Sequence, residues 1–163
     1  MTDKQALLLD GCRRGNLPQV TDLLQQDPSL INSTDSKGFS PLIIAVYNEQ
    51  PALVDYLLQQ GADVDAQDFA GNTALMGVCF KGYKTIAEQL LAAGADVNMT
   101  NANHATALTF AATFGHLTIA EMLLQRGADM HLRDVRGKSP LDHAVIQENE
   151  AMIELLDQHW QQQ

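Results

Sequence analysis

The chain has residue types that could carry out acid–base or metal chemistry, but their spacing does not favour a reactive site. Of its five histidines, His131 and His143 are twelve positions apart, with no Cys or carboxylate at a metal-ligand spacing. The nucleophile elbow G-x-S-x-G, the P-loop and the dinucleotide motif G-x-G-x-x-G do not occur. We therefore expect no catalytic residue, no metal and no cofactor, and a protein that is not an enzyme.

The elements that would position these residues repeat along the chain. A short Ser/Thr-Pro/Ala-Leu segment and a Gly-Ala-Asp segment each recur at an interval of 33 residues. They occupy residues 40–42, 73–75, 106–108 and 139–141, and residues 61–63, 94–96 and 127–129, respectively. A fixed period of this length indicates one supersecondary unit that buries its apolar face against the next copy. Asp63, Asp96 and Asp129 therefore belong to the repeat, and a continuous stack offers a groove in place of a catalytic cleft.

Each unit reads as a turn followed by two helices. Asp68 to Gly71 has the composition of a turn, and Thr73 is expected to cap a helix that runs to about Lys81 and ends at Gly82. A second helix follows, with paired apolar residues at helical period, and Gly94 ends it. Leu90 and Leu123 are predicted to be fully buried in the resulting core.

This pattern resembles the ankyrin repeat in its turn, its S/T-P-L start, its Leu-Leu pair and the Gly-Ala-Asp-Val-Asn of residues 94–98. The resemblance implies an all-α ankyrin-repeat solenoid of stacked helix-turn-helix units with short β-hairpin tips. One domain, 1–163, would contain an N-terminal cap at about 1–34, units at 35–67, 68–100 and 101–133, and a C-terminal cap at 134–163. Gln19 and Asp157 replace aliphatic residues in the end units, which predicts polar caps and a monomer.

The charge and the cysteines restrict the partners and the compartment. A net charge of -10 argues against nucleic acid or an anionic membrane as the partner, because phosphate binding depends on Lys and Arg. No secretory signal is visible. Cys12 and Cys79 fall where other units place Val46, Ala112 and Val145, so we expect buried, reduced thiols too far apart for a disulfide. These features favour a cytoplasmic protein.

Two departures from the repeat change local structure. The histidine usual at the fourth position of the ankyrin helix start is replaced by Ile43, Met76, Thr109 and Asp142, so its hydrogen-bond network should be missing. His104 stands where Gly38, Gly71 and Gly137 close the other turns. We expect His104 to adopt a positive φ at a cost of about 1 kcal/mol. Either sequence drift or a hairpin shaped for a partner would explain it.

The resemblance also implies where a partner binds, namely the turn residues and the exposed ends of the first helices. Five of the nine aromatic residues and five of the ten Lys and Arg residues fall there, and no acidic residue does apart from the turn carboxylates. Clustered aromatic and basic residues are typical of binding hot spots. The candidate partner-binding residues are Lys37, Phe39, Tyr47, Phe69, Phe80, Lys81, Phe114, Arg133, Val135, Arg136 and Lys138.

If these residues form a binding groove, Phe39, Phe69, Phe80 and Phe114 should be substantially exposed along one side, with Arg136 and Lys138 at one end. Phe110 is expected to belong to the core. The alternative is that the rings pack along the hairpins against neighbouring units. The partner should be another protein with an exposed apolar segment next to carboxylates. The chain would be an interaction module or, alternatively, a stoichiometric inhibitor of one enzyme or toxin, of the immunity type.

Overall fold

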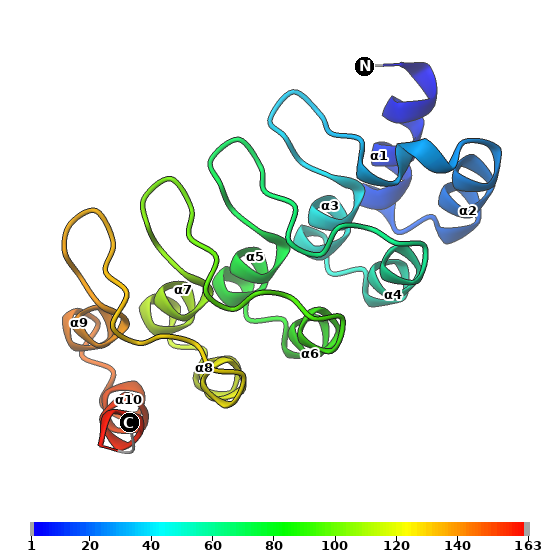
Figure 1. The fold of residues 1–163 in the computed structure, drawn as a ribbon. Helices are drawn as coiled ribbons and strands as arrows, with labels where there is room; N and C mark the ends of the chain where they lie inside the picture. The colour runs from blue at the N-terminus through cyan, green and yellow to red at the C-terminus, as the bar shows by residue number, and fades with distance from the viewer. Residues whose placement is uncertain (1, 162–163) are drawn as a thin grey trace.

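The computed structural model describes residues 2–161, and within them the chain forms five pairs of α-helices (Figure 1). Met1, Gln162 and Gln163, at the ends of the first and last expected units, lie outside the described residues. The first helices of the pairs are α1 (Asp3–Arg14), α3 (Pro41–Tyr47), α5 (Ala74–Lys81), α7 (Ala107–Phe114) and α9 (Pro140–Ile146). The second helices are α2 (Leu17–Gln26), α4 (Pro51–Gln59), α6 (Lys84–Ala92), α8 (Leu117–Gln125) and α10 (Glu150–Trp160), and a 3-10 helix, η1 (Pro28–Asn32), follows α2.

The helices form two layers. Helices α1, α3, α5, α7 and α9 pack side by side in an inner row, and the second helices form an outer row beside them (Figure 1). A long loop leads into each of α3, α5, α7 and α9, and these loops project in one direction from the inner row (Figure 1). The all-α solenoid predicted from the sequence is confirmed.

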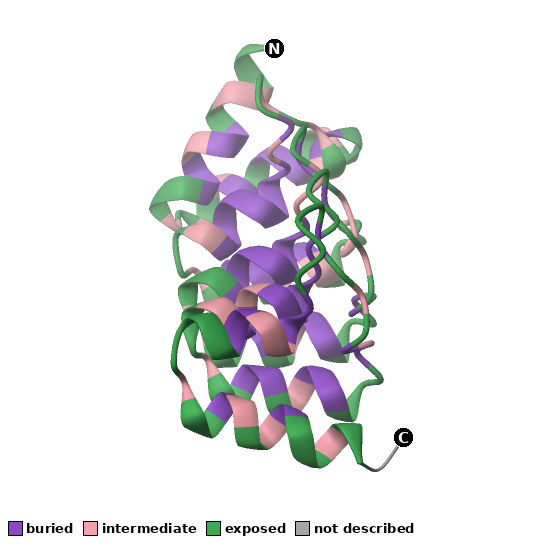
Figure 2. Ribbon diagram, turned by 90° about the vertical axis from the view of Figure 1, so that its left-hand side faces the viewer, coloured by how far each residue is buried: buried purple, intermediate pink, exposed green. Residues whose placement is uncertain are grey.

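The core lies between the two rows, where buried residues are concentrated (Figure 2). Leu90 and Leu123 are fully buried, as predicted. Cys12 and Cys79 are also buried and unpaired, which confirms the prediction of reduced core thiols. Val145 occupies the equivalent position in α9 but is 54% exposed, because no described helix packs on that side of α9. The C-terminal end of the stack therefore exposes an apolar side chain on α9, whereas Asp157 predicted a polar cap there.

The helix ends follow from local chemistry. The Thr73 hydroxyl accepts a hydrogen bond from the Met76 amide, and Gly82 ends α5 in the left-handed region at φ 82°. Thr109 and Asp142, which replace the usual histidine, each complete a capping box with the residue that caps their helix. The expectation of a missing network is thus wrong for these two units, because a shorter side chain at the same position bonds to the cap directly.

Within residues 2–161, three residues other than glycine have positive φ. His104 has φ 55°, as predicted from its place in the turn. Glu49 and Glu148 have φ 52° and 54°, and both stand where Gly82 and Gly115 end other first helices. Neither of these two positive φ angles was predicted from the sequence. No described helix is long and apolar enough to cross a lipid bilayer.

Candidate protein-binding surface

The inner surface comprises the four projecting hairpins, residues 34–40, 67–73, 100–106 and 133–139, together with the exposed ends of α3, α5, α7 and α9. The hairpins lie in a row beside the inner helices (Figure 1). They are built mainly from turns, and one isolated antiparallel bridge joins Gln67 and Thr73. All eleven candidate residues predicted from the sequence lie on these segments.

One side chain closes each hairpin turn in the same way. Asp35, Asp68, Asn101 and Asp134 each use Oδ1 to accept hydrogen bonds from the backbone N–H groups two and four residues later. The donor–acceptor distances are 2.8–3.0 Å. Since Asn101 makes the same bonds as the aspartates, the turn requires an acceptor oxygen and not a negative charge.

Backbone hydrogen bonds join each hairpin to the next. The amides of Phe69, Ala102 and Val135 donate to the carbonyl groups of Lys37, Ala70 and Asn103, at 2.9–3.0 Å. The tips are therefore held in a fixed register. A fixed register presents side chains at the tips at regular intervals, without the entropy cost of ordering them when a partner binds.

Two exposed rings meet on the inner surface. Phe80 at the end of α5 and Phe114 at the end of α7 are 42% and 45% exposed, and their rings pack edge-to-face with centroids 4.7 Å apart. Phe114 also stacks on Phe110, which is half-buried and packs against the core as predicted. The Lys81 Nζ lies 6.0 Å from the centroid of the Phe80 ring. The result is a continuous apolar patch that bridges two units.

Phe69 is the most exposed ring, at 77%, at the tip of its hairpin. It lies against the backbone of the preceding hairpin, where a Cβ atom on Gly38 would come within 2.6 Å of the ring. Gly38 has φ 82°, so the preceding hairpin (residues 34–40) requires glycine there, both for the backbone conformation and for the close approach of the Phe69 ring.

Phe39 differs from the prediction, because it is half-buried instead of substantially exposed. Its ring lies 6.0 Å from the ring of Tyr47, which is half-buried as well. Tyr47 in turn leans against Gly77 of the next unit, where an added Cβ atom would meet the ring at 3.1 Å. Burial, with a contribution from the Asp68 carboxylate, raises the pKa of Tyr47. This pair thus packs along the hairpin line, the alternative that the sequence left open.

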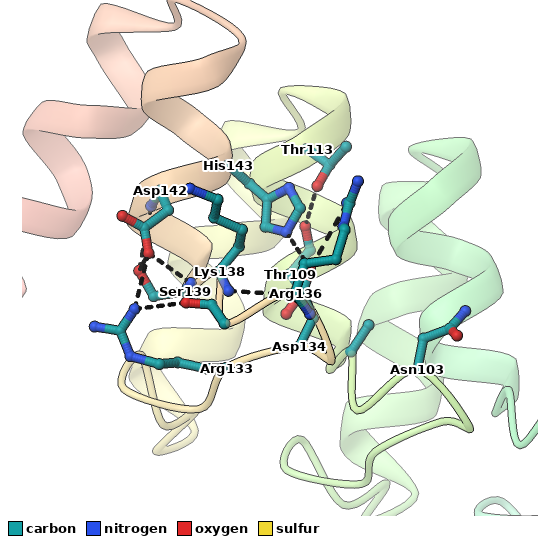
Figure 3. A network of polar contacts seen from close by, with 12 residues as sticks. Asn103, Thr109, Thr113, Arg133, Asp134, Arg136, Lys138, Ser139, Asp142 and His143 are labelled. Atoms are coloured by element: carbon teal, nitrogen blue, oxygen red, sulfur yellow. Dashed lines mark hydrogen bonds and ion pairs between the residues drawn. The ribbon is translucent and has the colours of Figure 1, made fainter.

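Three of the five basic candidate residues, Arg133, Arg136 and Lys138, lie at the hairpin that precedes α9 (Figure 3). Arg133 is engaged, since its Nη1 donates to the Gly137 carbonyl at 2.8 Å and pairs with Asp142 at 3.0 Å. The Arg136 side chain is 74% exposed, with one nitrogen 3.7 Å from Asp134. Lys138 is exposed and has no ion-pair partner among residues 2–161. Arg136 and Lys138 are therefore the cations of this hairpin that are most available to a partner.

A buried pair supports this hairpin from beneath. His143 of α9 lies with Nε2 2.8 Å from Asp134 Oδ2, and both side chains are almost fully buried (Figure 3). Burial alone raises the pKa of Asp134, but the Lys138 amide, the His143 ring and the Arg136 amide outweigh it, so the pKa is lowered. From the sequence, His143 was considered only as a possible metal ligand. The spacing of nine residues between Asp134 and His143 is the sequence feature that could have indicated this pair.

A hollow lies between α7, α9 and the last two hairpins. It was not predicted from the sequence. It encloses about 360 Å³. The apolar residues that line it are Ala105, Phe110, Phe114 and Val135, and the other lining residues are Asn101, Asn103, Thr109, Thr113, Asp134, Arg136 and His143. It is continuous with the Phe80–Phe114 patch through Phe114.

Within residues 2–161, metal-ligating side chains do not cluster, and both cysteine thiols are buried. No group of three or more His, Cys, Asp or Glu residues within residues 2–161 could hold a metal ion. Burial raises the pKa of Cys12 to about 12, against a smaller opposing effect of Arg13, and burial also raises the pKa of Cys79. Both thiols are therefore protonated near neutral pH and are poor nucleophiles.

The repeat geometry agrees with the comparison against known families. A family model described as ankyrin repeats (3 copies) matches residues 8–101 and again residues 75–162. No curated protein matches the chain. The two matched ranges together span nearly all of the sequence, and the stacked helix pairs with projecting hairpins are what that family model implies. The chain belongs to the ankyrin repeat family.

Proposed function

We propose that this protein is a non-catalytic, monomeric module that binds a partner polypeptide across the inner surface. Ankyrin repeats are in general protein–protein interaction modules. The observation that carries the proposal here is the exposed Phe80–Phe114 pair, which spans two units on the surface that the hairpins border. Exposed rings contribute little to folding, whereas aromatic side chains at the centre of an interface commonly dominate its binding energy.

The charge distribution supports a partner with acidic character. The chain carries a net charge of -10, yet Arg136 and Lys138 lie exposed together at one end of the inner surface. A partner that presents carboxylates at this end and apolar side chains toward Phe80 and Phe114 would match the surface in both respects. Charge complementarity of this kind sets the orientation of the partner and accelerates association.

Affinity capture from the cells in which the protein occurs tests the proposal. The bait would be compared with a Phe80→Ala/Phe114→Ala variant and with a Leu117→Ala/Trp160→Ala variant, which removes two exposed apolar side chains outside the inner surface. We expect the first variant to lose a partner that the wild-type chain and the second variant both retain. Equal recovery of every protein by all three baits would contradict binding through the inner surface.

A further inference from the structure

The hollow between α7 and α9 exists because two positions carry small side chains. Residues 105 and 113 occupy the positions, 66 residues on, of Phe39 and Tyr47 in the second unit. There the two rings pack together with centroids 6.0 Å apart and lie partly buried against the core. In the fourth unit Ala105 and Thr113 stand in their place, and both line the hollow. The hollow lies at the positions that an aromatic pair occupies two units earlier, with His143 in place of Gly77 on the facing helix.

The wall of the hollow suits an aromatic ring. Phe110 and Phe114 offer ring faces and edges, and Val135 offers an aliphatic surface, so an inserted ring would lose its hydration and gain aromatic contacts. The volume of about 360 Å³ is at the small end of the range of ligand pockets, and it suffices for one large side chain with a short stretch of backbone. An anchor residue of a polypeptide fits this description.

The polar groups at the rim indicate what should stand next to that ring. Arg136 is 74% exposed, while the Asp134 carboxylate beside it is already bonded to His143. The Asn103 side-chain amide has no hydrogen-bond partner among the described residues, so it can pair with the backbone of an extended segment. The rim therefore offers a cation for a carboxylate and an amide for a peptide group.

We infer that this hollow takes an aromatic anchor side chain of the partner, in an extended segment whose neighbouring residue is Asp or Glu. The carboxylate would lie against Arg136, and the ring would occupy the space that Phe39 and Tyr47 fill in the second unit. This inference rests on the proposed function, because it specifies the chemistry of the partner that binds the inner surface.

The test uses three capped dipeptides titrated to millimolar concentration into ¹⁵N-labelled protein. The peptides are N-acetyl-Phe-Glu-amide, N-acetyl-Phe-Lys-amide and N-acetyl-Ser-Glu-amide, and the measurement is the shift of backbone amide resonances. We expect saturable shifts at Ala105, Thr113 and Val135 with the Phe-Glu peptide. Binding of the Phe-Lys peptide should be weaker by about fivefold, the upper range for one exposed ion pair. The Ser-Glu peptide should produce no saturable shift.

Two variants address the hollow and its rim separately. Thr113→Tyr places in the hollow the residue that the second unit has there, and it should abolish binding of the Phe-Glu peptide. Thr118→Tyr, the same change on the exposed start of α8, should leave binding intact. Arg136→Gln should remove the preference for Glu over Lys while the shifts still map to the hollow. The peptide preference of Arg136→Gln can be measured even if Thr113→Tyr folds poorly.

Shifts that map elsewhere, equal affinities for the Glu and Lys peptides, or unchanged binding by Thr113→Tyr would each overturn the inference. The capture experiment distinguishes these failures from failure of the proposed function. If Phe80→Ala/Phe114→Ala loses the native partner while the dipeptides fail, the inner surface still binds and only the anchor is misassigned. If capture shows no dependence on the two rings, the proposed function falls.

Discussion

The His143 ring donates from Nε2 to Oδ2 of Asp134, 2.8 Å away, and so ties α9 to the turn that precedes it. Asp134 accepts with Oδ1 from two backbone amides at the same time. An ionised carboxylate can only accept hydrogen bonds, so the hydrogen atom between the two groups is bonded to Nε2 of His143. One buried carboxylate thereby holds both the hairpin and the last inner helix in place.

The last unit should lose stability in acid. The pKa of Asp134 is lowered, since hydrogen bonds from Lys138, His143 and Arg136 outweigh burial; the pKa of Asp142 is lowered mainly by the Ser139 amide and hydroxyl. A folded-state pKa below the unfolded value contributes stability that is fully present above about pH 4 and is lost as the pH falls below it. Urea unfolding monitored between pH 7 and pH 3 should show this loss.

Replacing Asp134 with Asn separates the charge from the turn. The turn should survive, because Asn101 closes the equivalent turn with the same two bonds. We expect a loss of about 1–2 kcal/mol at pH 7 from the weaker bond to His143, and a shallower decline in acid. Asp157→Asn, at an exposed carboxylate, serves as the control. An unaltered pH dependence in Asp134→Asn would show that the carboxylate is not responsible.

Glycine should stabilise the chain at Glu49 and at Glu148. Both residues have positive φ at the ends of α3 and α9, where other units have glycine, and a side chain costs free energy in that region. We expect Glu49→Gly to raise the free energy of unfolding by about 0.5–1 kcal/mol. Glu121→Gly, at an exposed site inside α8, should lower it by about 1 kcal/mol. Chemical unfolding measures the free energy of unfolding of both variants. A loss of stability in both would show that the backbone at Glu49 is not strained.

The repeat explains why most of the fold could be predicted. Each unit carries its own cap, apolar stripe and stop, so the local signals agree with the global stack at every period. Glu49 and Glu148 were missed because Glu gives no turn signal and because neither position was compared with Gly82 and Gly115, which end the equivalent helices of other units. His104 was found because its position could be compared with three glycines.

The inner surface was less predictable from the sequence. The position of each candidate residue follows from the period, but its exposure depends on which side chain lies beside it. Phe39 is half-buried because Tyr47 of its own unit packs against it. The hollow near Thr113 results from side chains that are small, and a list of large residues cannot reveal it. Comparing Ala105 and Thr113 with Phe39 and Tyr47 would have given the signal.

Leu90 and Leu123 should each be critical for stability. Both are fully buried in the outer helices α6 and α8, so Leu→Ala should cost about 2–5 kcal/mol. In a linear array each unit is stabilised by its neighbours, and the loss should spread to the adjoining units. Hydrogen exchange should therefore show faster amide exchange in α3 through α8 for Leu90→Ala and in α5 through α10 for Leu123→Ala. Faster exchange confined to a single unit would argue against this coupling.

Removing the aromatic patch should separate folding from binding. Phe80→Ala/Phe114→Ala deletes the edge-to-face contact between two half-exposed rings and the stacking of Phe114 on Phe110, which should cost about 1–2 kcal/mol of stability. Binding of the native partner should weaken by about 2 kcal/mol or more, as expected for hot-spot residues. Calorimetry measures the second quantity once the partner is captured, and circular dichroism measures the first. A variant that unfolds while partner binding persists would place these rings in the core.

Reversing one exposed charge should change the rate of association more than the lifetime of the complex. Lys138 suits this test better than Arg136, because Arg136 lies 3.7 Å from Asp134 and its reversal would disturb the turn. We expect Lys138→Glu to lower the association rate with the acidic partner and to flatten its dependence on ionic strength, since exposed charges act mainly by steering. Lys84→Glu makes the same charge change on α6, outside the inner surface, and should have a much smaller effect. Stopped-flow measurements at low and high salt distinguish the two variants. Equal effects of both variants would mean that only net charge matters, and that the basic end of the inner surface does not face the partner.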